Sequence, residues 1–236
     1  MMEKGGLKMK FNKRIVLAGL MIFTAFQISA LAGPSAENSN SRFQSDLSSL
    51  RKNVLPVCAQ FQAGKPAESN DKLIADIDSI ISKWKAMSDA YKNNPPAGYS
   101  KDPSWSGYFD EALDNFEIMR DKAGQGNYKR ATQFCGMNCG LFVNMNQVSG
   151  IDKLSDKMFV LRKNAKLMMD MIKADNWKGA AHMNKHNDEL VTVMPAEVAS
   201  AYNSFTKEIE KKDGAAAGKK FMEFLKIFGA AYSNYL

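Results

Sequence analysis

The sequence predicts an all-α protein: two tandem antiparallel four-helix units, packed as a helical bundle after a cleaved signal peptide. Apolar residues recur at steps of three and four along most of the chain, which is the stripe of an amphipathic helix facing a core. No comparable stretch alternates apolar and polar residues as a strand does. The chain has only 7 prolines and 16 glycines in 236 residues, few for a loop-rich β-sandwich.

The first 32 residues have the features of a signal peptide, with a start-site extension over 1–8. A basic stretch at 10–14 precedes an apolar run at 15–30, and Ala30-Leu31-Ala32 has the small-residue pattern of a cleavage site. The apolar run is shorter than the roughly 20 residues that a membrane span needs. We therefore expect cleavage after Ala32, a periplasmic or secreted protein, and no transmembrane segment after cleavage.

The formal charge of +7 belongs mainly to this leader. Five of the 32 basic residues and one of the 25 acidic residues lie in 1–32, so the remainder carries a net charge of only +3. The remaining charges are interspersed, whereas phosphate binding needs clustered Lys and Arg. We therefore expect no nucleic-acid partner, and the partner class that remains is an unknown protein or small ligand.

Proline, glycine and asparagine residues divide the rest of the chain into about eight predicted helices. The polar residues 33–40 predict a disordered lead-in, followed by a first four-helix unit over 41–149 and a second over 150–236. Pro56 is expected to kink or split the first helix, because proline lacks an N–H donor. The predicted helices span 41–63, 69–92, 104–123, 127–147, 153–175, 177–193, 195–212 and 215–235.

A short internal repeat supports the division into two units. Leu50-Arg51-Lys52-Asn53 recurs as Leu161-Arg162-Lys163-Asn164, and both copies lie on the first predicted helix of their unit. At an offset of 90 residues, Phe134 on the fourth predicted helix corresponds to Phe224 on the last. These matches favour a duplication.

The three cysteines, Cys58, Cys135 and Cys139, are the disulfide candidates. Cysteines of exported proteins are usually in disulfides. The first and fourth helices of an up-down bundle are neighbours, so Cys58 can pair with either of the other two and leave one thiol free. A strained bridge within the turn, three reduced buried thiols, and a metal or redox role are the alternatives.

The segment Cys135-Gly136-Met137-Asn138-Cys139-Gly140 lies on the fourth predicted helix of an exported bundle. In that position the chain resembles the cytochrome c-prime-like four-helix bundles, which carry a haem motif on their last helix. Covalent haem needs the pattern C-x-x-C-H. Here the cysteines are four residues apart and Gly140 stands where the histidine would be. We therefore expect a haem-less protein without a cofactor.

Two clusters are candidate metal ligands. Cys135, Met137 and Cys139 offer sulfur donors for a soft ion such as Cu(I). His182 and His186 are four residues apart, so on a helix they project to one side and can chelate a metal. The residue after the first histidine is not the glutamate that a zincin uses, and an exposed polar helix face is the simpler interpretation of the pair.

The sequence contains no catalytic motif of the G-x-S-x-G, P-loop or G-x-G-x-x-G type. We therefore expect an exported, soluble helical binding or structural module that is haem-less and not an enzyme. The alternative is a periplasmic metal-handling protein for copper or zinc that uses one of the two ligand clusters.

Overall fold

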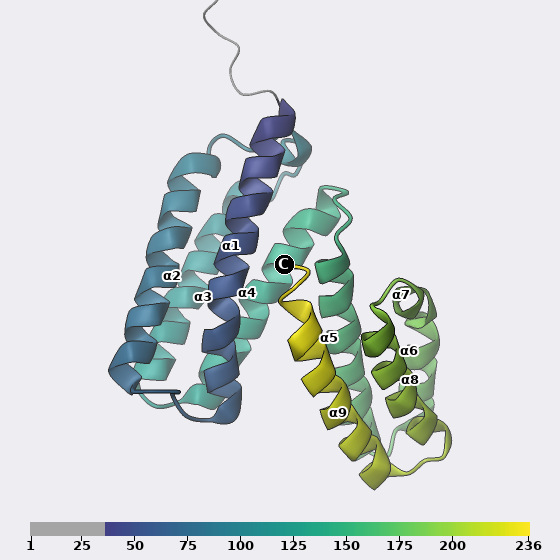
Figure 1. Ribbon diagram of the computed structural model, residues 1–236. Coiled ribbons are helices and arrows are strands. Elements are labelled where there is room, and N and C mark those ends of the chain that lie inside the picture. Colours follow the sequence, from purple (N-terminus) through teal and green to yellow (C-terminus); the bar gives the residue numbers. More distant parts are fainter. Residues whose placement is uncertain (1–35) are drawn as a thin grey trace, which may run out of the picture. The chain divides into compact units, whose positions relative to one another are not determined.

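The computed structural model describes residues 36–236, which form helices and short connections (Figure 1). This part of the chain has nine α-helices, one short 3₁₀ helix (η1) and no strand, so the predicted all-α helical bundle is confirmed. Contacts join Ala36–Leu236 into one compact unit. The predicted signal peptide and its cleavage site after Ala32 lie outside the described residues. The elements are α1 (Ala36–Ala63), α2 (Asn70–Tyr91), η1 (Ala97–Tyr99), α3 (Trp105–Gly124), α4 (Tyr128–Val148), α5 (Leu154–Lys173), α6 (Trp177–His186), α7 (Asp188–Thr192), α8 (Ala196–Glu210) and α9 (Gly214–Tyr232).

Helices α1 to α4 enclose the first of two hydrophobic cores. Helix α1 packs on α2 and α4, and α3 packs on the same two helices. Trp84 of α2 is fully buried, stacks on Phe109 at a centroid distance of 4.9 Å, and donates its indole N–H to the Phe109 carbonyl at 2.9 Å. The indole is thus both packed and hydrogen-bonded, as a buried tryptophan requires.

Helices α5 to α9 enclose the second core. Helix α5 packs on α6 and α9, and α8 packs on α9 and α6. Tyr202 of α8 meets Phe224 of α9 edge to face at a centroid distance of 5.7 Å, and Met168 of α5 is fully buried beside them in the same core. Along the chain, the connection between α4 and α5 separates the helices of the first core from those of the second, and the expected boundary at 149/150 falls in this connection. That each unit folds as a separate domain stays a prediction.

Helix α1 begins at Ala36, so the predicted disordered lead-in over 33–40 is wrong for residues 36–40. The side-chain oxygen of Asn40 accepts a hydrogen bond of 2.9 Å from the Gly98 N–H in η1. The first turns of α1 therefore have a partner in the segment before α3. A polar composition predicts exposure at these positions, but exposure is compatible with a helix that packs on one side only.

Pro56 lies inside the continuous helix α1. The expectation that it would split this helix is therefore wrong, and a kink is the part of the expectation that stays open. Pro56 and Lys52 are both exposed. Proline has no N–H to donate to the Lys52 carbonyl, and this missing bond lies on the exposed side of α1 rather than in the core.

The predicted helix over 177–193 is wrong, because Asn187 divides this segment into α6 and α7. Asn187 is fully buried. Its amide nitrogen donates to the Tyr202 hydroxyl at 2.7 Å, and its oxygen accepts from the Asn164 amide at 2.7 Å. These bonds fix the side chain in the second core, and a turn at this residue replaces the continuous helix.

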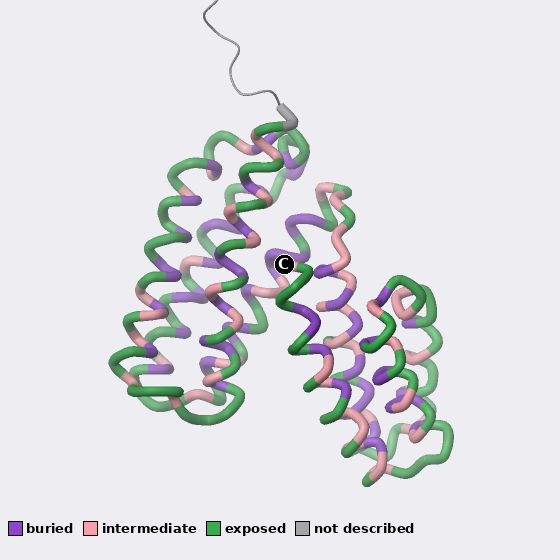
Figure 2. The backbone as a smooth tube through the Cα atoms, viewed as in Figure 1, coloured by how far each residue is buried: buried purple, intermediate pink, exposed green. Residues whose placement is uncertain are grey.

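The helices of the described chain are amphipathic, and Figure 2 shows exposed residues on every long one. None of the helices in 36–236 has the combination of length and hydropathy that crossing a bilayer requires.

Candidate functional site

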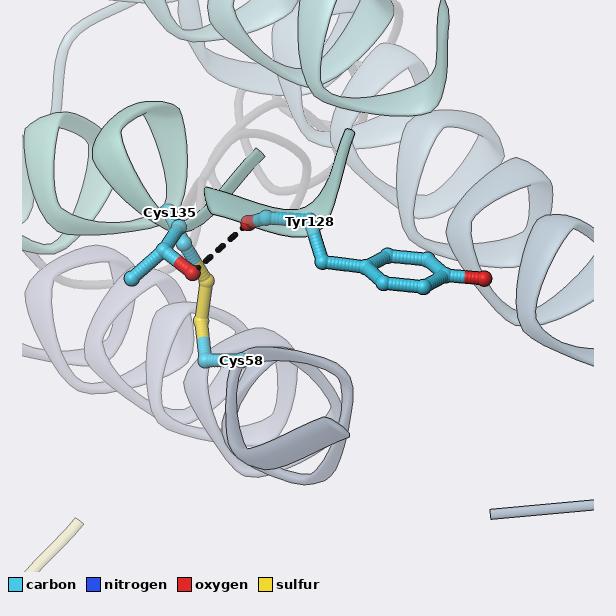
Figure 3. Close-up of a disulfide and its surroundings, with 4 residues drawn as sticks. Cys58, Tyr128 and Cys135 are labelled. Carbon is cyan, nitrogen blue, oxygen red and sulfur yellow. Dashed lines mark hydrogen bonds between the residues drawn. A yellow bond between two sulfur atoms is a disulfide. The ribbon is translucent and has the colours of Figure 1, made fainter. Parts of the chain in front are cut away.

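A disulfide between Cys58 and Cys135 joins α1 to α4 (Figure 3). The two Cα atoms are 6.0 Å apart, and both residues are buried in the first core. One turn from the bond, the Thr132 hydroxyl donates to the Tyr128 carbonyl at 2.8 Å, and the Tyr128 ring stacks on Phe61 of α1 at 6.2 Å. Among the three candidate cysteines, the structure thus pairs the first two.

Cys139 is the remaining cysteine and carries a free, half-buried thiol. Burial raises the pKa of this thiol, while the guanidinium groups of Arg51 and Arg162 act in the opposite direction. Because burial has the larger effect, Cys139 is a protonated thiol at neutral pH and a weak nucleophile.

The predicted sulfur ligands do not share one environment. The Cys135 sulfur is bonded to Cys58, so it offers no thiolate to a metal. Met137 is 50 % exposed, while Cys139 is half-buried. A soft-metal site in this segment is therefore left with Met137 and Cys139.

The two histidines of α6 do come together. Their Nε2 atoms are 3.1 Å apart, and both side chains are exposed. Two nitrogens bound to one zinc ion at about 2.0–2.1 Å have a similar separation. Within residues 36–236, no group of three or more His, Cys, Asp or Glu side chains is arranged to hold a metal ion. The pair alone thus has the geometry of two ligands, and other ligands would have to come from solvent or a partner.

The most extensive buried polar site joins the two cores and was not anticipated. We call it the Arg51 cluster, and it comprises Gln44, Arg51, Tyr99, Asn146, Asp156 and Tyr232. Arg51 of α1 donates to Asp156 of α5 at 2.7 Å and to the Tyr232 hydroxyl of α9 at 2.6 Å. One guanidinium therefore connects a helix of the first core to two helices of the second.

Asn146 of α4 completes the Arg51 cluster on the side of the first core. Its amide nitrogen donates to the second oxygen of Asp156 at 2.6 Å. Its oxygen accepts from the Tyr99 hydroxyl at 2.6 Å and from the Gln44 amide at 2.8 Å. Both oxygens of Asp156 and the amide of Asn146 are thus satisfied, which a buried charged group requires.

Charge in the Arg51 cluster is balanced locally. Burial disfavours the charge of Arg51, but Tyr232 and Asp156 outweigh it, so the pKa of Arg51 is raised. Burial raises the pKa of Tyr232 to about 12. Arg51 is therefore a cation and Tyr232 a neutral hydrogen-bond partner at physiological pH.

Sequence reasoning identified Arg51 only as a member of the internal repeat. The sequence nevertheless holds a signal, because Arg51 stands on the apolar stripe of Leu47, Val54 and Cys58, where a charge needs a partner. Its equivalent Arg162 lies over the Phe228 ring of α9 at 5.9 Å, as Arg51 lies over the Tyr232 ring of the same helix at 6.0 Å. The two arginines differ in burial, because Arg51 is buried and paired with Asp156, whereas Arg162 is half-buried.

Comparison of the chain with protein-family models, with curated proteins and with solved structures found no match.

Proposed function

We propose that the chain is an exported, non-enzymatic helical module that binds an unknown protein or small ligand, or supports one structurally. The disulfide between Cys58 and Cys135 is the observation that carries this proposal. Disulfides persist in the periplasm and outside the cell and are rare in the cytosol. The bond therefore supports the export that the leader predicts, with a periplasmic or secreted product.

Fractionation of cells and sequencing of the mature N-terminus test the export. The expected result is a protein in the periplasm or medium that begins at Gly33. The double variant Ala30→Arg, Ala32→Arg leaves the apolar run intact up to residue 29 but lacks the small residues of the cleavage site, so it should keep its leader. Recovery of the unaltered protein from the cytosol would overturn the proposal.

We further propose that the module is a haem-less relative of the cytochrome c-prime-like bundles. The residues present do not fit covalent haem, because Cys135 is bonded to Cys58 and Gly140 occupies the place of the iron ligand. The protein should therefore lack a Soret band even when it matures together with the cytochrome c assembly machinery. A Soret band that survives denaturation would contradict this part of the proposal.

A metal-handling protein is the second candidate, and the separation of 3.1 Å between His182 Nε2 and His186 Nε2 favours it. Titration with Zn²⁺ or Cu²⁺ should then show one equivalent bound, and His182→Ala should abolish binding. Lys185→Ala is the matched control, since this exposed residue lies on the same helix between the two histidines. Binding that persists in His182→Ala but disappears in Cys139→Ser would move the site to Met137 and Cys139. Absence of stoichiometric metal would exclude the candidate.

A further inference from the structure

The histidine pair of α6 is half of a tetrahedral metal site. Zinc in a structural site takes four protein ligands, whereas the Nε2 atoms of His182 and His186 supply two. Within residues 36–236, no other His, Cys, Asp or Glu side chain is placed to join them as a third ligand. Both rings are exposed, so the unfilled positions of an ion bound there are open to the surroundings. The missing ligands therefore have to come from outside the chain.

The fold holds this pair in place before any metal binds. Asn184 and Asn187 bracket His186, and both bond to the buried Tyr202 hydroxyl of α8. This hydroxyl donates to the Asn184 side-chain oxygen at 2.9 Å and accepts from the Asn187 amide at 2.7 Å. Asn184 is two residues from each histidine and so points to the other side of the helix. The last turn of α6 is thus anchored to the second core, and an ion binds without first having to order it.

The charges beside the pair favour the approach of a second copy of this chain in antiparallel orientation. Lys178 lies about one turn before His182, and Glu189 lies about one turn after His186. Both side chains are exposed. A twofold axis through the ion exchanges the two ends of the segment, so Lys178 of each copy approaches Glu189 of the other.

We propose that a Zn²⁺ ion joins two copies of this chain, with His182 and His186 of each copy as its four ligands. The inference rests on the metal-handling candidate above and adds the partner that completes its site. Four nitrogens leave no position for a water molecule, so this ion links the chains instead of activating water for hydrolysis. Assembly then depends on the supply of metal: two chains pair when they share one ion and separate when each holds its own.

Sedimentation velocity of the purified protein over a range of Zn²⁺ concentrations tests this proposal. We expect a monomer in EDTA and a dimer at one ion for every two chains. In excess Zn²⁺ we expect a monomer again, with one ion on each chain. His182→Ala and His186→Ala should each abolish the dimer, and Lys185→Ala, at the exposed position between them, should keep it. Lys178→Glu should weaken dimerisation by about three- to tenfold, because it turns two exposed contacts of opposite charge into contacts of like charge.

Four results would overturn the proposal in whole or in part, and they separate it from the metal-handling candidate. Zinc bound by a monomer at every ratio would keep that candidate and show that water completes the site. A dimer that persists in EDTA or in His182→Ala would mean that the chains associate through another surface. Undiminished dimerisation of Lys178→Glu would refute the antiparallel approach. No bound zinc would overturn both the dimer and the metal-handling candidate, and none of these results bears on export.

Discussion

Arg51 and Asp156 are separated by 105 residues in the sequence and form an ion pair of 2.7 Å with side chains only 5 % and 4 % exposed. The pair lies where helices of the two cores meet; the second Nη of Arg51 donates to Tyr232, and the second oxygen of Asp156 accepts from Asn146. A buried pair of this kind contributes little over a well-packed apolar pair, but removing one partner strands the other charge. Its main effect is therefore on the specificity with which α1 meets α5 and α9.

Replacing Arg51 with an apolar residue should destabilise the fold. Arg51→Met leaves Asp156 charged and buried, and we expect the free energy of unfolding to fall by about 3–5 kcal/mol. The double variant with Asp156→Leu should lose less than the single variant, because no charge is left unpaired. Urea unfolding followed by circular dichroism measures both.

Arg120→Met is the control for Arg51. Its ion pair with Asp78 joins α3 to α2 at the surface, with side chains 48 % and 47 % exposed, so its loss should change stability by at most about 1 kcal/mol. If Arg51→Met and Arg120→Met lowered the free energy of unfolding equally, burial would add nothing to the effect of the ion pair between Arg51 and Asp156.

The disulfide should stabilise the protein by restricting the unfolded chain. Cys58 and Cys135 are 77 residues apart, and for a loop of this length the chain-entropy model gives about 4.5 kcal/mol. Cys58→Ser should lower the free energy of unfolding by up to that amount, whereas Cys139→Ser should have a small effect. Thiol titration of the unfolded protein should find one thiol without reductant and three with it. Three thiols in both samples would refute the bond.

Asn138 should be a site where an apolar substitution stabilises the protein. It is fully buried on α4, and neither of its amide atoms has a hydrogen-bond partner within the described residues. Asn138→Leu has a similar volume and should raise the free energy of unfolding by about 1–3 kcal/mol. Asn203→Leu, at an exposed position of α8, should change it by less than about 0.5 kcal/mol. Destabilisation by Asn138→Leu would reveal a polar partner that the native amide needs.

Stability should fall at alkaline pH because burial raises the pKa of several tyrosines, among them Tyr91, Tyr99, Tyr202 and Tyr232. Burial raises the pKa of Tyr202 to about 12 and that of Tyr232 to about 12. An unfolded tyrosine has a pKa of about 10, so the folded state retains these protons more strongly. The resulting stabilisation is complete below about pH 10 and is lost as the pH rises through about 12. Urea titrations over this range should give a shallower decline for Tyr202→Phe than for Tyr235→Phe, at an exposed tyrosine. An equal decline of stability with pH in the two variants would contradict the role of the buried Tyr202 hydroxyl.

The sequence predicted the helices well where the apolar stripe is regular. The stripe of α2, with Leu73, Ile77 and Trp84, is buried as expected. The break at Asn187 was missed because no proline or glycine marks it. Asn187 ends α6 by binding Tyr202 and Asn164, and these partners adjoin it only in the folded core.

The candidate sites, too, could be predicted only where the spacing of neighbouring residues decides the geometry. The spacing of His182 and His186 placed them on one face, since helical geometry alone decides that. The spacing of the cysteines narrowed the disulfide to a few pairings, and only the register of α1 against α4 selects Cys135. The Arg51 cluster depends on contacts between helices far apart in the chain, and no local pattern encodes which carboxylate meets Arg51.

The bond between Cys58 and Cys135 also governs what a protease can do to this molecule. A single cut in the exposed connection after α2, at Asn93 or Asn94, would leave both fragments on one covalent molecule. Such a nicked protein would migrate as one band without reductant and as two bands with it. The two fragments of the first core would thus stay joined after a cut until the disulfide is reduced.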